Sequence, residues 1–489
     1  MTMTTGQIIE PSAVSAHEES DGVIAWWGWA VALFVLYTSF SLMRHHNLAT
    51  TGYDLGIFTQ AVRGYAEFGA PRSDLKGWNY NLFGDHFHPI LGTLVPLYWL
   101  WPGAQVLLVA QAALLAVAAV PLSQLASRRL GRPGGHAVAV AYGLSFGVQG
   151  ALAFDFHEVA FAAPLLAWSL TSLSRGRYRA AFFWALPLLM VKEELSLTVA
   201  AIGMVLVIRR QRHLGVLLIG IGLICFAVIT GVLIAAVNPD GVYPYFSAAG
   251  EQGLLDRLME TPVLLVWPAT KVTTLFLLCS LSGGIALRSP LALVALPTIA
   301  VRFLPDNPLY WGTGLQYNLP LMAIVFAAAL DAQPMLVRST RRLVRGLGRR
   351  AGAAFLIAAA PFSTGSTGHL QTFLLNPVKA FTSTPQARAA HALMRKIPDG
   401  VTVEATNGLS PHLAHRTRVY IWPLTRRQPE WAIINLNESW PVAPQYHQAR
   451  VNELHNQGYR LFAVQENIAL LQKTTKNSRL IQYAANSQK

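Results

Sequence analysis

Long apolar runs recur along the first three quarters of the chain and are separated by short polar loops. A helix needs about 20 mostly apolar residues to cross a bilayer, and about eleven runs have the composition for this role. They lie near residues 23–43, 104–126, 135–153, 159–173, 180–191, 195–208, 214–237, 262–281, 285–301, 316–331 and 351–362. The pattern predicts an α-helical polytopic membrane protein, with a cytoplasmic tail over residues 1–22 and a transmembrane domain over residues 23–362.

The composition indicates that lipid is the solvent of this region. Of the 489 residues, 53% are hydrophobic and only 13% are charged, whereas soluble proteins carry about 25% charged residues. The net charge of +14 would suggest a nucleic-acid partner in a soluble protein. Here many of the positive charges are arginines in short loops, where they set membrane orientation. We therefore expect no nucleic-acid partner.

Four arginine clusters define the expected topology. They are Arg128, Arg129 and Arg132; Arg175, Arg177 and Arg179; Arg209, Arg210 and Arg212; and Arg338, Arg341, Arg342, Arg345, Arg349 and Arg350. Basic loops favour the cytoplasmic side, and counting spans from a cytoplasmic N-terminus places all four clusters there. The chain is then a multi-pass protein of the cytoplasmic membrane. Its outer side holds residues 44–90, which we call the outer loop, residues 154–158 and everything after about 363.

Residues 180–208 provide a test of the predicted number of spans. If these residues formed a single long helix, the arginine cluster before it and the cluster after it would lie on opposite faces of the membrane. The topology instead predicts a hairpin of two short helices with Lys192, Glu193 and Glu194 at its tip. Because charged side chains face lipid at a high cost, the tip is expected in a polar cavity or at the outer interface.

The chain changes character after residue 363. Alternating apolar positions predict five strands, and two further segments have the pattern of helices. The strands are predicted at 401–406, 418–422, 431–436, 459–464 and 468–472, and the helices at 385–396 and 443–457. Residues 363–489 are therefore expected to form a small extracytoplasmic α/β domain. Its 14 Lys and Arg against 6 Asp and Glu fit either a contact with anionic headgroups or polymers or an ordinary solvated surface.

Polar chemistry concentrates on the predicted outer face. Residues 52–58 follow the first span, residues 84–89 lie where the chain re-enters the membrane, and residues 154–158 end the third span. Ionisable groups from separate spans are costly at a membrane face unless they share a wet cavity. We therefore predict a site. Its candidates are Tyr53, Asp54, Asp85, His86, His88, Asp155, His157 and Glu158, with Glu193 and Glu194 from the hairpin tip.

Two other interpretations of these residues remain open. Carboxylates and imidazoles are also ligands for divalent metals such as Zn²⁺ or Mn²⁺, although the spacing matches no closed zinc motif. The candidate ligands are Asp85, His86, His88, Asp155, His157 and Glu158. Alternatively, these side chains cap helix ends and hydrogen-bond at the headgroup level. The two cysteines, Cys225 and Cys279, each lie in an apolar run and indicate no metal site of their own.

The predicted cytoplasmic loops contain no nucleotide-binding motif. They have no P-loop and no GxGxxG segment after a strand. An enzyme with this topology would work on the outer side. ATP and nucleotide sugars are then not expected as direct substrates.

The order of these features resembles the C-type (GT-C) membrane glycosyltransferases. Tyr53 and Asp54 correspond to the segment of their catalytic acid, His88 with Pro89 to their re-entry motif, and Asp155 to their second outer acid. More closely, the chain resembles an uncharacterised prokaryotic membrane family grouped with them. That similarity covers roughly residues 45–475 and includes residues 53–60, 85–89, 154–158, 192–194, 302–305, 316–320 and 405–416.

The resemblance implies transfer of a sugar from a polyprenyl-phosphate donor to an outer acceptor, which is a glycan, a protein or a small molecule. An inverting transfer needs a carboxylate base, and Asp54 is the candidate, with Asp155 as the second acid. Leu55 follows Asp54 where the protein mannosyltransferases have another acidic residue, so the acceptor class stays open. The remaining candidates are Arg302, Lys192 and Arg63 for the donor phosphate, and Gln316 and Tyr317 for the sugar.

Simpler roles exist for these cations, and other functions for the chain. Arg302 at a span end fits a headgroup contact, and Lys192 fits an ion pair at the hairpin tip. A lipid or sugar transporter is the first alternative function, but transporters usually contain related halves, and no repeat is visible between the halves here. A non-catalytic cell-envelope scaffold is the second alternative.

Overall fold

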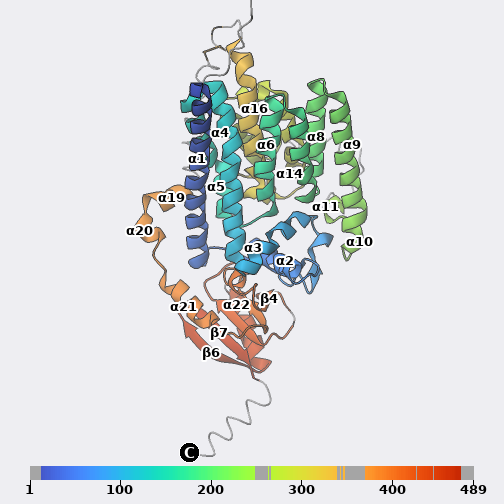
Figure 1. Cartoon of the computed structure of the whole chain (residues 1–489). Coiled ribbons are helices and arrows are strands. Elements are labelled where there is room, and N and C mark those ends of the chain that lie inside the picture. Colours follow the sequence, from blue (N-terminus) through green and yellow to red (C-terminus); the bar gives the residue numbers. More distant parts are fainter. Residues whose placement is uncertain are drawn as a thin grey trace, which may run out of the picture.

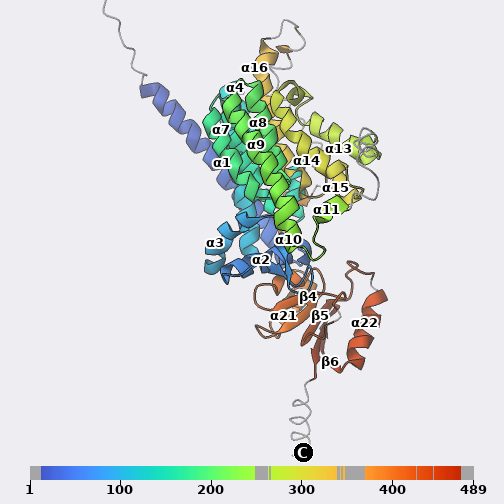
Figure 2. The same cartoon turned by 90° about the vertical axis from the view of Figure 1, so that its right-hand side faces the viewer.

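A computed structural model describes residues 13–247, 263, 266–338, 342, 345–346, 369–425, 427–443 and 445–474. It contains a bundle of helices with a small sheet domain at one end (Figure 1). The bundle and the sheet domain are stacked along one axis in the perpendicular view as well (Figure 2). The span predicted at residues 351–362 lies outside the described residues.

Four stretches of helix are long and apolar enough to cross a membrane. They are Ile24–His46, Ala104–Ala153, Arg212–Val237 and Gln316–Val337. Their main helices are α1 (Ala13–His46), α4 (Ala104–Gly143), α9 (Arg212–Val228) and α16 (Leu319–Val337). Shorter apolar helices cover most of the other predicted spans. The described residues therefore confirm a helical architecture with several apolar spans, and the total of about eleven stays a prediction.

The remaining helices fill the bundle, form the outer loop or connect the two parts. In the bundle they are α5 (Phe146–Ala153), α6 (Ala162–Ser174), α7 (Tyr178–Ala185), α8 (Leu195–Ile208), α10 (Ala235–Val237), α11 (Pro244–Ser247), α13 (Ala269–Ser280), α14 (Leu296–Phe303) and α15 (Pro308–Trp311). The outer loop contains α2 (Ile57–Ala66), β1 (Arg72–Ser73) and β2 (Tyr80–Asn81), and α3 (Val95–Leu100) follows it. The connecting segment contains α19 (His369–Leu375) and α20 (Pro377–Ala380).

Two predicted reversals of the chain are visible in the bundle. α4 is interrupted at Gly131, whose φ of +80° is not helical and favours glycine. The Gln111 side chain, in the part of α4 before Gly131, donates to the Ala151 carbonyl of α5 at 3.2 Å. The helix before Gly131 and the helices after it therefore run side by side in opposite directions. A second break separates the helix that ends at Met190 from α8. Residues 191–194 occupy it, as the hairpin prediction requires.

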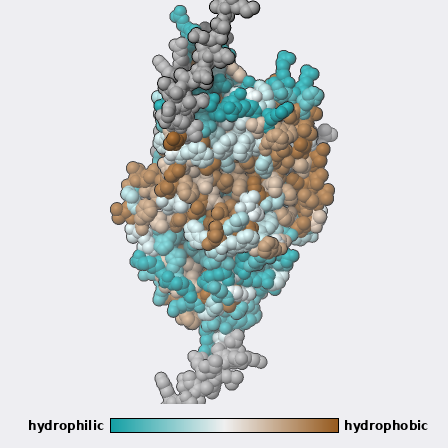
Figure 3. Space-filling view, in the orientation of Figure 1, coloured by the Kyte–Doolittle hydropathy of each residue, from teal (hydrophilic) through white to brown (hydrophobic). Residues whose placement is uncertain are grey.

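Arginines gather at the end of the bundle that is opposite the sheet domain. Arg129 donates to the Ser174 carbonyl at 3.3 Å, which joins two of the predicted clusters. Arg209 pairs with Asp331 at 2.5 Å near the end of α16. An apolar band separates this polar end from the polar sheet domain (Figure 3). This distribution is the one that the positive-inside rule predicts for a membrane protein.

The C-terminal domain has a five-stranded mixed sheet in the order β4-β3-β5-β7-β6. β3 pairs in parallel with β4 and β5, whereas β7 is antiparallel to β5 and β6. All five strands and both helices lie where the sequence predicts them. They are β3 (Thr402–Ala405), β4 (Arg418–Ile421), β5 (Trp431–Asn435), β6 (Tyr459–Gln465), β7 (Ile468–Lys473), α21 (Pro385–Met394) and α22 (Gln445–Asn456).

The outer loop packs directly on this domain. Ile57 and Leu75 share one buried hydrophobic cluster with Leu409 and other residues of the domain. Arg418 forms an ion pair with Asp74, with contacts of 2.7 and 3.1 Å. Burial of apolar side chains on both sides indicates a fixed contact, since such interfaces resemble a protein core. The outer loop and the C-terminal domain therefore form one structural unit.

Candidate active site

A cavity of about 380 Å³ lies between the outer loop and the adjacent ends of the bundle helices. Most of the residues predicted from the sequence line it: Tyr53, Asp54, Asp85, His86, His88, His157, Glu158, Lys192, Glu194, Arg302, Gln316 and Tyr317. Lys76, Tyr243, Tyr245 and Tyr310 also line it, and the sequence did not single them out. Residues from at least four separate segments of the chain thus share one polar hollow.

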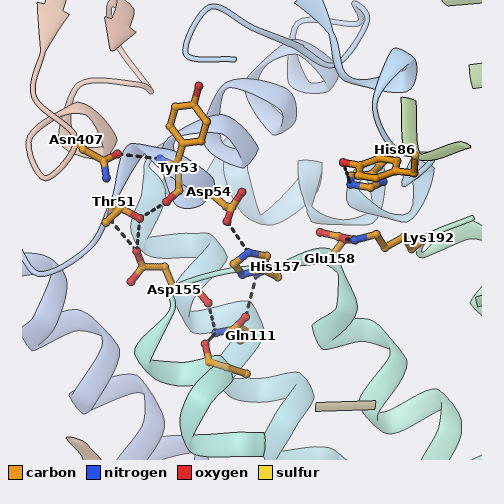
Figure 4. A network of polar contacts seen from close by, with 12 residues as sticks. Thr51, Tyr53, Asp54, His86, Gln111, Asp155, His157, Glu158, Lys192 and Asn407 are labelled. Carbon is orange, nitrogen blue, oxygen red and sulfur yellow. Dashed lines mark hydrogen bonds and ion pairs between the residues drawn. The ribbon is translucent and has the colours of Figure 1, made fainter. Parts of the chain in front are cut away.

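Asp54 and His157 form the central contact of this cavity (Figure 4). His157 Nε2 lies 2.7 Å from Asp54 Oδ2. The Asp54 side chain is 32% exposed, whereas that of His157 is 5% exposed. Burial alone would raise the pKa of Asp54, but His157, Lys76 and Lys192 outweigh it and lower this pKa below its usual value. Asp54 is therefore an ionised carboxylate at neutral pH.

The rigid support of His157 comes from α4. Gln111 accepts the backbone N–H of His157 at 3.1 Å, and its amide donates to the Asp155 carbonyl at 2.6 Å. The loop that carries His157 is thereby tied to the N-terminal part of α4, which begins at Ala104. Because a side chain on a rigid element keeps its geometry, this arrangement fixes the ring that contacts Asp54.

Asp155 lies behind Asp54, outside the cavity lining. Its Oδ2 accepts the backbone N–H of Thr51 at 2.7 Å and the Thr51 hydroxyl at 3.2 Å. Its Oδ1 lies 3.9 Å from the Arg44 guanidinium. Burial raises the pKa of Asp155 to about 6, against the opposing effect of Arg44. The structure thus places this acid where it holds the backbone just before Tyr53 and Asp54.

Arg302 brings a buried positive charge to the cavity. Its guanidinium donates to the Tyr310 carbonyl at 2.9 Å, the Asn318 side chain at 2.9 Å and the Gly312 carbonyl at 3.0 Å. All three acceptors are neutral. Among the described residues, no carboxylate lies within ion-pair distance of Arg302. Its charge is therefore positioned but not neutralised by a direct partner.

Lys192 and Lys76 are paired with acids. Lys192 Nζ lies 3.2 Å from Glu158 Oε1, and Lys76 Nζ lies 2.9 Å from Asp85 Oδ2. Burial alone would raise the pKa of Asp85, but the nearby positive charges, His86 and Lys76 foremost, lower it to about 2. Both pairs leave the lysine charges largely compensated, in contrast to Arg302.

Glu193 lies outside the cavity lining and joins the hairpin tip to the outer loop. It contacts His86 Nδ1 at 2.7 Å and accepts the Phe87 backbone N–H at 3.1 Å. Tyr243 donates to the same carboxylate at 3.0 Å. Lys192 and Glu194 of the tip line the cavity, which is one of the two positions predicted for the tip, and Glu193 beside them acts as a structural link.

The C-terminal domain reaches the candidate base through Asn407. The Asn407 carbonyl accepts the Gly52 N–H at 2.8 Å, and its side-chain oxygen accepts the Tyr53 N–H at 3.0 Å. Gly52 permits this close approach, because a Cβ at this position would lie 2.0 Å from Ser410 Oγ. For Asn407, the only signal in the sequence was the resemblance over residues 405–416, which does not identify a role for this side chain.

Arg63, a candidate for the donor phosphate, does not line the cavity. Its guanidinium pairs with Glu67 at 2.8 Å and donates to the Thr417 carbonyl at 3.0 Å. Arg63 therefore helps to hold the C-terminal domain on α2. The amphipathic helix that carries it turns this side chain toward the domain, which the spacing alone did not reveal.

The candidate metal ligands are distributed over separate pairs. Among the described residues, no group of three or more His, Cys, Asp or Glu side chains has a geometry that would hold a metal ion. Asp85 pairs with Lys76, Glu158 with Lys192 and Asp155 with Arg44, whereas His86 contacts Glu193 and His157 contacts Asp54. Among the described residues, the buried His88 Nδ1 has no hydrogen-bond partner. The alternative of a divalent metal therefore has no ligand set in this part of the chain.

Comparisons with known proteins agree with this fold. The chain is similar to the solved structure of ArnT from Cupriavidus metallidurans bound to undecaprenyl phosphate. The TM-score is 0.51 with 14% sequence identity, over 92% of this chain and 98% of the ArnT chain. At this identity the likeness shows that the chain has a fold similar to that of ArnT. No curated protein matches the chain.

A family model described as a predicted membrane protein matches residues 44–470, which includes the outer loop, the bundle and most of the C-terminal domain. This range agrees closely with the extent of the resemblance seen in the sequence. The chain belongs to the DUF2079 family of predicted membrane proteins.

Proposed function

We propose that this protein is an inverting membrane glycosyltransferase that moves a sugar from a polyprenyl-phosphate donor to an acceptor outside the cytoplasm. One observation supports the proposal above all others. The ionised Asp54 and the directly unpaired Arg302, from distant parts of the chain, line the same cavity of about 380 Å³. A base and an anion-binding group in one hollow are the two parts that this reaction requires.

Asp54 is the proposed general base. Among the described residues, the carboxylate has a hydrogen-bond partner only at Oδ2, which His157 contacts. Oδ1 is then the oxygen that takes the proton from the acceptor hydroxyl. The hydroxyl oxygen forms a bond to the anomeric carbon of the sugar while the bond from that carbon to the phosphate oxygen breaks.

Arg302 is the proposed partner of the leaving group. The departing polyprenyl phosphate gains negative charge in the transition state, and a fixed cation in a site of low dielectric stabilises this charge. Three neutral oxygens orient the guanidinium without cancelling its charge. Lys192 is the second cation, although it must share its charge with Glu158.

The cavity has apolar as well as polar walls. Ile57, Phe58, Val301 and Leu304 line it beside the charged groups, and Gln316 and Tyr317 offer hydrogen bonds and a ring to a sugar. A phosphate linked to a long hydrocarbon chain can contact both kinds of wall, the phosphate at the polar part and the chain at the apolar part. The solved ArnT structure, with its similar fold, contains undecaprenyl phosphate. Glycans, proteins and secreted small molecules all remain candidate acceptors.

The test uses the full chain in liposomes with radiolabelled polyprenyl-phosphate hexose or pentose donors and a cell-envelope fraction as the acceptor source. Release of polyprenyl phosphate together with labelled acceptor is expected. Asp54→Asn should lower the rate by about 10²–10⁴-fold, the usual contribution of a general base. The exposed Asp240→Asn has the same chemical change and should transfer normally.

The outcome separates the alternatives. Near-normal transfer by the Asp54→Asn protein would remove Asp54 from the role of base. Labelled donor that crosses the bilayer without release of polyprenyl phosphate would indicate a transporter. No transfer by the natural chain with any donor, alongside an unchanged envelope phenotype for Asp54→Asn, would indicate a scaffold.

A further inference from the structure

A second cavity, of about 400 Å³, lies between the C-terminal end of α1 and the segment that contains α19 and α20. None of its lining residues lines the first cavity, although Arg44 contacts Asp155 behind the candidate active site. They are Phe40, Met43, Arg44, Asn47, Ala49, Thr372, Phe373, Asn376, Lys379 and Ala380. The wall is thus built from two segments that are more than 300 positions apart in the sequence.

The lining has the chemistry of an anion site with an apolar floor. It contains two cations, Arg44 and Lys379, and no Asp or Glu. The Arg44 guanidinium donates to the carbonyls of Ala49 and Ala153, both at 2.7 Å. Asp155 lies 3.9 Å from it, behind the wall, so this ion pair is a long one. Phe40 and Phe373 meet edge to face at 5.5 Å and provide the apolar part. A ligand that fits carries negative charge next to hydrocarbon.

The segment that closes the cavity is placed for contact with lipid. Leu370 is buried against the bundle, whereas Leu374, Leu375, Val378 and Phe381 are 49–83% exposed. In the shared orientation of Figures 1 and 3, α19 and α20 lie at the lower left margin of the apolar band. Exposed apolar residues on a short helical segment at this depth are typical of a membrane-interface contact.

We infer that the second cavity binds the headgroup of an anionic phospholipid. Its phosphate lies between Arg44 and Lys379, and an acyl chain covers the exposed row formed by Leu374, Leu375 and Val378. Inorganic phosphate shares the charge chemistry, but it would leave that row uncovered. Attraction between basic side chains and anionic headgroups is favourable at the membrane surface, and the apolar row adds the burial that a free ion lacks.

The experiment uses the full chain in nanodiscs that contain a trace of phosphatidylglycerol or phosphatidylcholine with a photoactivatable group near the headgroup. After illumination and digestion, the attached peptides are identified by mass spectrometry. We expect several-fold more attachment to residues 369–381 from phosphatidylglycerol than from phosphatidylcholine. Lys379→Glu should abolish this preference. Lys396→Glu, an equal charge change at an exposed position of the C-terminal domain, should preserve it.

Two results would overturn the inference: equal attachment of both lipids, or an unchanged preference in the Lys379→Glu protein whose thermal unfolding matches the natural chain. An excess of inorganic phosphate that removes the signal would indicate a free-ion site instead. The inference does not depend on the proposed glycosyl transfer, because Asp54→Asn leaves both sides of this cavity intact and should retain the lipid preference.

Discussion

At the scale of single residues, the contact between His157 and Asp54 affects both the orientation and the pKa of the candidate base. The ring contacts one carboxylate oxygen at 2.7 Å, and in the proposed reaction the other oxygen takes the proton of the acceptor hydroxyl. It also helps to keep the pKa of Asp54 below its usual value in spite of burial. The same histidine is fixed through its backbone to Gln111. A base held in one orientation needs less reorganisation during proton transfer.

We expect His157→Ala to lower kcat by about 10–100-fold, by analogy with the loss seen when the hydrogen-bond partner of a metal ligand is removed. The loss should be smaller than that of Asp54→Asn, because the base remains but is free to rotate. His157→Gln restores an N–H donor and should recover part of the rate. Steady-state kinetics with the polyprenyl-phosphate donor check this. An unchanged kcat in His157→Ala would show that Asp54 needs no such support.

At the scale of elements, the site depends on the docking of the C-terminal domain. Arg418 and Arg63 hold the domain against the outer loop, and Glu438 accepts the Gly408 N–H at 3.1 Å, next to Asn407. Asn407 then binds Gly52 and Tyr53, immediately before the candidate base. The sheet domain is therefore a structural part of the candidate site.

The prediction for the contact of Asn407 with Gly52 and Tyr53 concerns the position of the Asp54 side chain. Asn407→Ala leaves the partly buried Tyr53 N–H without its acceptor, which costs about 1–3 kcal/mol, and Asp54 should shift as the loop relaxes. We expect kcat to fall by about tenfold or more for such a cost, with little change in KM for the donor. Asn407→Asp keeps an acceptor oxygen and should recover most of kcat. An equal loss in both variants would indicate general destabilisation instead of positioning.

The elements were predictable to different degrees. The strands and helices of the C-terminal domain follow from local alternation and lie where the sequence placed them. The break at residues 191–194 followed from arginine parity, which is a global constraint on topology. The number of spans was less accessible, because several helices, such as α6 and α8, are shorter than a bilayer-spanning length and their burial depends on neighbours.

The site was predictable where ionisable residues occur at predicted span ends. His157 and Arg302 are examples, since charge at such positions is costly unless it is used. Asp54 lies further from a span, within the outer loop, and its proposed role came from the resemblance. Lys76 and Asn407 were not accessible in this way. Each lies in an ordinary polar stretch and becomes part of the site only through tertiary contacts. Arg63 does not line the cavity, and this was not predictable for a related reason, because its distance along the chain from Asp54 does not show the face of α2 to which it belongs.

At the scale of the whole molecule, charge is distributed along the bundle axis. Arginines of the loops gather at one end, where Arg129 contacts Ser174 and Arg209 pairs with Asp331. Helix α2 of the outer loop and the C-terminal domain lie at the other end (Figure 2), and residues of the outer loop line the candidate active site. Because basic loops favour the cytoplasmic side, this polarity predicts that the cavity opens outside the cytoplasm. A lipid-linked donor would have to present its sugar on that side.

Labelling of single cysteines tests this orientation in intact cells. Cys225→Ser and Cys279→Ser first remove the two native thiols, and then Lys396→Cys or His213→Cys introduces an exposed thiol at the domain end or at the arginine end. We expect a membrane-impermeant maleimide to label Lys396→Cys in intact cells and His213→Cys only after permeabilisation. If only the His213→Cys protein were labelled in intact cells, the topology would be the reverse of the predicted one. The cavity would then face the cytoplasm, and nucleotide-linked donors would have to be considered, although the loops contain no nucleotide-binding motif.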